Sequence, residues 1–169
     1  PAPAAAEHLD ELRGFALYLP KGMDFGWRSV GEYLRAFDRD GTALNVIQLV
    51  GHGTLRIAAM GFARRAPTAA ELAAMEGMLA EAIEDGAWGL STGLIYAPGS
   101  FAATEEVVAL ARVAGRRRGF YASHIRGEGA TLLDAVREAI RVGREADLPV
   151  QISHVKASGR PNWGKVADA

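Results

Sequence analysis

The chain has 169 residues, of which 49% are hydrophobic and 23% are charged. This is the composition of an ordinary globular domain, so it argues against a disordered, collagen-like or membrane-spanning chain. The 19 basic and 20 acidic residues nearly cancel, so no basic excess points to nucleic acid as a partner. Cysteine is absent, which excludes disulfides, thiolate nucleophiles and Cys-ligated metals from this stretch. We expect a cytoplasmic protein with no membrane partner.

In chain order, the first predicted elements are a helix from Ser29 to Phe37 and a buried strand from Ala43 to Val50. The strand is a short apolar run bounded by residues that break regular structure. A longer helix follows from Thr68 to about Asp85, with apolar residues at helical spacing. Thr68 is its expected cap, and Glu71 completes a capping box.

The second half of the chain alternates regularly between strands and helices. Strands are predicted at Trp88 to Ser91, Phe120 to Ser123 and Val150 to Ser153, and helices lie between them at Thr104 to Arg117 and Thr131 to Ala146. Thr104 is the expected cap of its helix. None of the strands alternates cleanly between apolar and polar residues, which is typical of parallel strands covered on both faces.

The residues at the ends of the predicted strands also repeat, which supports the same alternation of strands and helices. Ser91-Thr92, Ser123-His124 and Ser153-His154 each follow an apolar strand, at separations of 32 and 30 residues. Strands and helices alternating at such intervals indicate right-handed βαβ units. We therefore predict an α/β fold in which parallel βαβ repeats form about half of a (β/α)₈ TIM-type barrel.

His124 and His154 are the candidate metal ligands. In a (β/α)₈ barrel the functional side chains project from the carboxyl ends of the strands, where both histidines are placed. Two histidines on adjacent strands can share one zinc ion. The alternative is a pair of half-buried histidines bonded to the backbone. Since a catalytic zinc needs three protein ligands, these two cannot complete a site.

Lys156 and Tyr96 are the candidate substrate-binding residues. Lys156 lies two residues beyond His154 and would face the same side, where an ammonium group can neutralise a substrate carboxylate. Tyr96 follows the strand that ends at Thr92, and its phenol can donate to a carbonyl or carboxylate. The alternatives are a solvated loop lysine and a tyrosine that packs its loop.

Other polar residues near the strand ends favour structural roles. His52 lies between two glycines and is expected to be structural. Arg126 and Glu128 are expected to form an ion pair where a helix begins. The serine before each strand-end histidine, Ser123 or Ser153, is expected to be a satisfied hydroxyl in the packed layer.

Four segments of the chain resemble the D-aminoacylases (N-acyl-D-amino-acid deacylases) of the amidohydrolase superfamily. The segments are 86–99 (GAWGLSTGLIYAPG), 121–128 (YASHIRGE), 152–159 (ISHVKASG, followed by Asn162-Trp163-Gly164) and 50–56 (VGHGTLR). The resemblance implies a zinc-dependent barrel hydrolase, with one or two ions, that removes the acyl group from N-acyl-D-amino acids. It also implies that His124 and His154 are zinc ligands and that Tyr96 and Lys156 contact the substrate, the lysine at its carboxylate.

Several features of the family have no counterpart in this chain. They are a His-x-His pair on the first barrel strand, a metal-binding cysteine and a catalytic aspartate on the last strand. We therefore expect residues 1–169 to be the central part of a barrel domain truncated at both ends, and inactive alone. The last residues resemble the first turn of a helix capped by Asn162.

Two other functions remain open from the sequence. One is a cyclic-amide hydrolase of the same superfamily, similar to dihydroorotase or hydantoinase, although these enzymes use a carbamylated lysine that no strand-end lysine here matches. The other is a non-catalytic half-barrel module. Because half a barrel exposes two sheet edges, we expect it to self-associate or to pair with the missing half.

Overall fold

A four-stranded parallel sheet forms the centre of the structure, a computed structural model that describes residues 2–16 and 26–169. The strands are β1 (Val50–Gly51), β2 (Gly89–Gly93), β3 (Phe120–His124) and β4 (Val150–Ile152), in the order β1-β2-β3-β4. Each pair of neighbours is parallel and consecutive in the chain. The predicted α/β fold of parallel βαβ repeats, as in a segment of a (β/α)₈ barrel, is confirmed.

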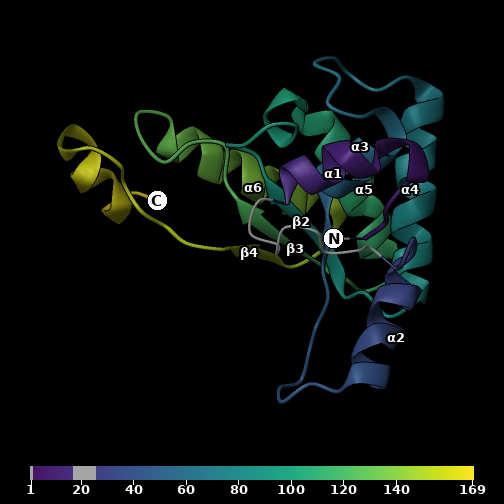
Figure 1. The fold of residues 1–169 in the computed structure, drawn as a ribbon. Helices are drawn as coiled ribbons and strands as arrows, with labels where there is room; N and C mark the ends of the chain where they lie inside the picture. Colours follow the sequence, from purple (N-terminus) through teal and green to yellow (C-terminus); the bar gives the residue numbers. More distant parts are fainter. Residues whose placement is uncertain (1, 17–25) are drawn as a thin grey trace.

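Helices connect these strands and cover the sheet. The α-helices are α1 (Leu9–Phe15), α2 (Val30–Asp40), α3 (His52–Met60), α4 (Ala69–Glu84), α5 (Thr104–Arg116) and α6 (Leu132–Ala146), and the short 3₁₀ helices are η1 (Ala6–His8), η2 (Gly99–Phe101) and η3 (Arg160–Ala167). Helix α5 packs against α4, α6, β2 and β3. Figure 1 shows η3, in yellow, beyond the end of β4 and away from α4. Among the described residues, no helix is both long and apolar enough to cross a membrane.

The predicted helix caps are confirmed at one of three positions. The Thr68 hydroxyl accepts from the Glu71 N–H at 3.2 Å, and the Glu71 carboxylate accepts from the Thr68 N–H, so the capping box at α4 is present. Thr104, however, is the first residue of α5, and Ala103 precedes it as the cap. The Thr104 hydroxyl, already inside the first turn, instead donates a charge-assisted hydrogen bond to Glu138 on α6 at 2.8 Å.

The first predicted strand is largely wrong. Of residues Ala43 to Val50, only Val50 is in β1, while Leu44 is 78% and Ile47 58% exposed. The reason lies in the register: β2 begins at Gly89, and its ladder pairs Val50 with Leu90. Residues before Gln48 therefore extend past the beginning of β2, where the described chain provides no neighbouring strand. The predicted helix at the chain end also differs, since η3 follows Gly159 rather than an Asn162 cap.

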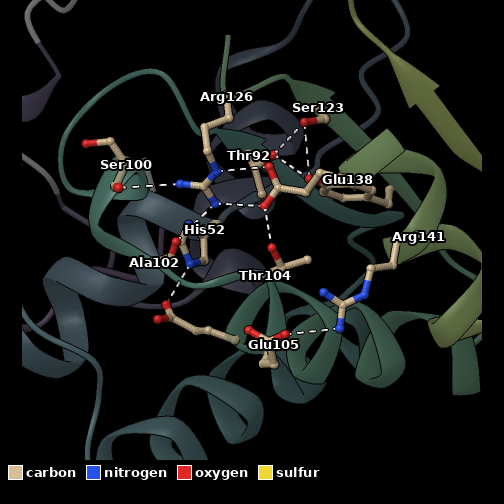
Figure 2. A network of polar contacts seen from close by, with 12 residues as sticks. His52, Thr92, Ser100, Ala102, Thr104, Glu105, Ser123, Arg126, Glu138 and Arg141 are labelled. Atoms are coloured by element: carbon tan, nitrogen blue, oxygen red, sulfur yellow. Dashed lines mark hydrogen bonds and ion pairs between the residues drawn. The ribbon is translucent and has the colours of Figure 1, made fainter. Parts of the chain in front are cut away.

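The core between sheet and helices fixes the strand ends. Leu90 on β2 and Tyr121 on β3 are fully buried in one hydrophobic cluster with residues of α4 and α5. At the end of this cluster, Ser123 Oγ lies 3.0 Å from Thr92 Oγ1 and accepts from Tyr121 Oη at 3.1 Å (Figure 2). Ser123 is thus the satisfied core hydroxyl that was predicted. Ser153 is exposed, so the same prediction is wrong there because β4 ends at Ile152.

Candidate metal centre

His124 and His154 come together at the carboxyl ends of two neighbouring strands. His124 is the last residue of β3, and His154 lies two residues beyond β4, whose Ile152 is paired with Ser123. His124 Nδ1 and His154 Nε2 are 3.0 Å apart. The ring centroids are 4.4 Å apart and the ring planes nearly perpendicular, at 88°. The structure therefore places the two predicted ligands side by side, each with one nitrogen toward the other.

Glu128 is a third member of this cluster that the sequence reasoning missed. Its Oε1 lies 3.3 Å from His124 Nε2 and 3.1 Å from His154 Nδ1, and the residue is only 8% exposed. The predicted ion pair between Glu128 and Arg126 is wrong, since Arg126 pairs with Glu138 at 2.9 Å. A signal was present: a carboxylate four residues after His124, in a glycine-flanked loop that leaves a strand end.

These residues fit a divalent metal ion. His124, Glu128 and His154 each offer a ligand atom within 4.8 Å of the others. Nitrogens bound to one tetrahedral zinc at 2.0–2.1 Å lie about 3.3 Å apart, close to the 3.0 Å between the facing histidine nitrogens. Around this pair, His124 Nε2, His154 Nδ1 and Glu128 Oε1 are buried at ion-pair distance from one another, without an aligned hydrogen bond to any described residue. Buried polar atoms without partners are rare in native proteins and are consistent with a bound ion next to them.

The surroundings favour the neutral form of His124, which is the form that binds a metal. Burial is the largest influence and lowers the pKa of His124, and the nearby charges of His154 and Lys156 lower it further. The Glu128 carboxylate acts in the opposite direction, but the net direction is downward. His124 therefore needs to release no proton to a metal near neutral pH.

Lys156 and Tyr96 lie beside the histidine pair, as predicted. Lys156 Nζ is 3.1 Å from Glu128 Oε1, the same oxygen that faces both histidines, and the lysine side chain is 54% exposed. The Tyr96 ring is 4.9 Å from the His124 ring between centroids, and this tyrosine is also exposed. Both side chains are thus next to the candidate metal site and open to solvent.

Arg126, in the loop after β3, connects this loop to α6 and to the loop after β2 that carries Tyr96. Its guanidinium makes two 2.9 Å hydrogen bonds to the Glu138 carboxylate on α6 and donates to the Ala102 carbonyl at 3.0 Å, in the loop that follows Tyr96 (Figure 2). The hydrogen bonds to Glu138 raise the pKa of Arg126. The Ser158 N–H donates to the Glu128 carbonyl at 2.6 Å, which joins the loop after β3 to the loop after β4.

His52 has the structural role that was favoured for it. It is fully buried, and its Nε2 lies 2.8 Å from Glu106 Oε1 on α5. Arg56 on α3 donates to both oxygens of the same carboxylate, at 2.8 and 2.6 Å. Desolvation by burial would raise the pKa of Glu106, but hydrogen bonds and charges from His52 and Arg56 lower it below its ordinary value. This triad joins α3 to α5 and is separate from the His124–His154 cluster.

Parallel βαβ units with histidines and a carboxylate at adjacent strand ends define the class: a segment of a (β/α)₈-type fold with a candidate metal site at its carboxyl edge. No family model matches the chain. It is 42% identical over 147 residues (87% of its length) to the D-aminoacylase of Alcaligenes xylosoxydans xylosoxydans. It is 46% identical over 135 residues (80% of its length) to the N-acyl-D-glutamate deacylase of the same organism.

A solved structure agrees with these sequence relatives. The N-acyl-D-glutamate deacylase of Bordetella bronchiseptica, in complex with zinc and a phosphonate mimic of the tetrahedral intermediate, matches 99% of this chain with a TM-score of 0.86 and 40% identity. The chain spans 30% and 28% of the two sequence relatives and 34% of the solved chain. The resemblance to D-aminoacylases is confirmed: in sequence and fold, this chain corresponds to about a third of such a protein.

Proposed function

We propose that residues 1–169 are part of a zinc-dependent hydrolase that removes the acyl group from N-acyl-D-amino acids. The observation that carries the proposal is the His124–His154 pair at the ends of β3 and β4, with Lys156 and Tyr96 beside it. The similarity to D-aminoacylase and to N-acyl-D-glutamate deacylase supports this substrate class.

In this proposal, His124 and His154 hold the zinc ion. When bound, zinc lowers the pKa of a bound water toward about 7 and polarises the amide carbonyl. The parallel strands fix the separation of the two histidines, so the site is organised before substrate arrives. We expect the remaining ligands and the general base to come from outside these residues, and so the chain alone to be inactive.

Lys156 binds the carboxylate of the D-amino acid. Its ammonium group is half-exposed and paired with the Glu128 carboxylate, so it is held near the histidines while remaining accessible. Tyr96, whose ring is tilted against that of His124, donates a hydrogen bond from its hydroxyl to the same carboxylate or to the amide carbonyl. Two anchors hold the amide in a fixed orientation, which lowers the entropic part of the barrier.

No observation favours the cyclic-amide alternative. The lysines among the described residues are Lys156 and Lys165, and neither lies in a strand. Lys156 pairs with Glu128, and Lys165 donates to the Ala130 carbonyl. A bridging carbamylated lysine therefore has no counterpart in the described part of the chain. A cytoplasmic location and self-association stay predictions.

The experiment is a substrate comparison with the zinc-loaded protein expressed from its complete reading frame. N-acetyl-D-amino acids with neutral and acidic side chains, their L-enantiomers, and a hydantoin are tested in parallel for release of free amine or ring opening. We expect hydrolysis of at least one N-acetyl-D-amino acid and none of its L-enantiomer. Turnover of the hydantoin, with no deacylation of any D-substrate, would contradict the proposal.

A further inference from the structure

Glu128 is a buried carboxylate with more partners than an ordinary ion pair. One of its oxygens, Oε1, faces His124 Nε2, His154 Nδ1 and Lys156 Nζ at 3.3, 3.1 and 3.1 Å. The Glu128 carbonyl accepts from the Ser158 N–H, which anchors the loop that carries this side chain. A buried carboxylate is costly unless its charge is compensated, so this oxygen is held in place by the three nitrogens around it.

The two nitrogens of each histidine lie in different environments. His124 Nδ1 and His154 Nε2 face each other at 3.0 Å, whereas His124 Nε2 and His154 Nδ1 lie on the Glu128 side. A neutral imidazole carries one proton, on one of these two nitrogens. The position of that proton decides which nitrogen has a lone pair for a metal.

Only one proton arrangement leaves both facing nitrogens free to bind a single metal ion and puts both N–H groups on the Glu128 side. If the nitrogens beside Glu128 were the metal ligands, the protons would sit on His124 Nδ1 and His154 Nε2, and two N–H donors would face each other at 3.0 Å. In the opposite arrangement both protons lie on the side of the Glu128 carboxylate, and both lone pairs lie on the side where the two rings meet. A ligating histidine commonly donates its other N–H to a carboxylate in this way.

We propose that Glu128 is a positioning residue of the metal centre, one carboxylate shared by both histidines. Its negative charge, 3.3 Å from His124 Nε2 and 3.1 Å from His154 Nδ1, favours the protons on these two nitrogens and so leaves His124 Nδ1 and His154 Nε2 to bind zinc, without Glu128 itself becoming a ligand. Lys156 contacts the same oxygen, which links the substrate-binding lysine to the metal centre. This inference rests on the proposed function, because it assumes that the histidine pair binds zinc.

The first experiment measures zinc affinity by competition with a chelator, in the protein expressed from its complete reading frame. Loss of an outer carboxylate partner weakens metal binding by about 10- to 100-fold. We expect this loss in Glu128→Gln and Glu128→Ala, and no change in Glu81→Gln, which removes an exposed carboxylate on α4. Affinity in Glu128→Gln within twofold of wild type would overturn the inference.

The absorption spectrum of the Co²⁺-substituted protein separates a positioning role from direct ligation. We expect Glu128→Gln to keep the wild-type visible bands, since the ligands of the ion are unchanged. A shift of these bands that reports a changed coordination number would show that Glu128 is itself a ligand, and would overturn the inference. Whichever spectrum Glu128→Gln gives, zinc binding by the wild-type protein would leave the proposed function intact.

A measurement on the wild-type protein keeps the inference testable even if the variants do not fold. Imidazole ¹H–¹⁵N correlation spectra of the zinc-loaded protein report which nitrogen of each histidine carries the proton. We expect Nε2–H on His124 and Nδ1–H on His154, and the reverse pattern would contradict the inference. A wild-type protein that bound no zinc would overturn both this inference and the proposed function.

Discussion

Lys156 has two carboxylate partners in this account, Glu128 in the structure and the substrate in the proposed reaction. Its ammonium contacts only one oxygen of Glu128, and the side chain is 54% exposed. A substrate carboxylate can therefore approach from the solvent side without displacing Glu128. In the proposed reaction, Lys156 thus contacts both the Glu128 carboxylate beside the metal site and the carboxylate of the substrate.

Replacing Lys156 with alanine tests this role. A hydrogen bond to a charged group contributes about 1.5–3 kcal/mol, so kcat/KM for an N-acyl-D-amino acid should fall by about 10- to 100-fold. Steady-state kinetics measure the effect, with Lys165→Ala as the control because Lys165 donates to a backbone carbonyl. Equal losses in the two variants, or no loss in Lys156→Ala, would rule out the proposed carboxylate contact.

The sequence alone could predict the two histidines but not the glutamate between them. His124 and His154 follow apolar strands, and the barrel rule places such residues at one edge of the sheet. Glu128 depends instead on the path of the loop after β3, where Gly127 packs so close to the Thr131 side chain that a Cβ would not fit. Sequence periodicity contains no information about that path.

At the scale of elements, the buried triad of His52, Arg56 and Glu106 joins α3 to α5. Removing one partner of a buried charged pair leaves the other uncompensated and costs about 3–5 kcal/mol. We expect Glu106→Gln to lower the free energy of unfolding by about 3 kcal/mol at pH 7. Urea denaturation measures it, with Glu81→Gln as an exposed control.

The same triad predicts a pH dependence of stability. The pKa of Glu106 is lowered in the folded state, so its contribution is fully present above the unfolded value of about 4.3 and is lost as pH falls through the folded value. The stability difference between wild type and Glu106→Gln should therefore shrink on acidification below about pH 4. An unchanged difference between pH 7 and pH 3 would show that the carboxylate charge contributes nothing.

The Arg126 contacts give a second prediction at this scale. Arg126→Ala removes hydrogen bonds to Glu138 and Ala102 and should cost about 1–2 kcal/mol, because the pair is partly exposed. In this variant, hydrogen exchange of the backbone amides should be faster than in wild type in the loop after β2, which carries Tyr96. Arg137→Ala removes only an exposed pair with Asp134 and is the matched control. Equal exchange in this loop in both variants would contradict the anchoring role.

Elements were predictable where local pattern and tertiary context agree. The capping box at Thr68 and the strands β2, β3 and β4 follow from local sequence, and each of these strands has a neighbouring strand in register. The apolar residues from Ala43 onward were predicted as a strand, but a strand also needs a partner in register, which begins only at Gln48. Helix α3 was missed because it begins directly at the end of β1, with no polar cap.

At the scale of the whole molecule, the sheet has two edges in the described residues. β1 and β4 each pair with one strand, and the exposed Leu44 and Ile47 lie in the segment that leads into β1. Because the chain spans about a third of the length of its relatives, we expect the remaining metal ligands of the proposed site to lie outside residues 1–169. The parallel topology was predictable from the repeat of strand ends, whereas the partners of the edges were not.

The central claim is that a zinc ion held by His124 and His154 is required for deacylation. It is tested most directly by measuring zinc content and hydrolysis of an N-acyl-D-amino acid together, in wild type, His124→Ala and His154→Ala, each expressed from the complete reading frame. We predict that wild type loses activity on chelation and regains it with zinc, and that both variants have reduced zinc and no measurable deacylation. Full zinc content and wild-type activity in either variant would contradict the claim.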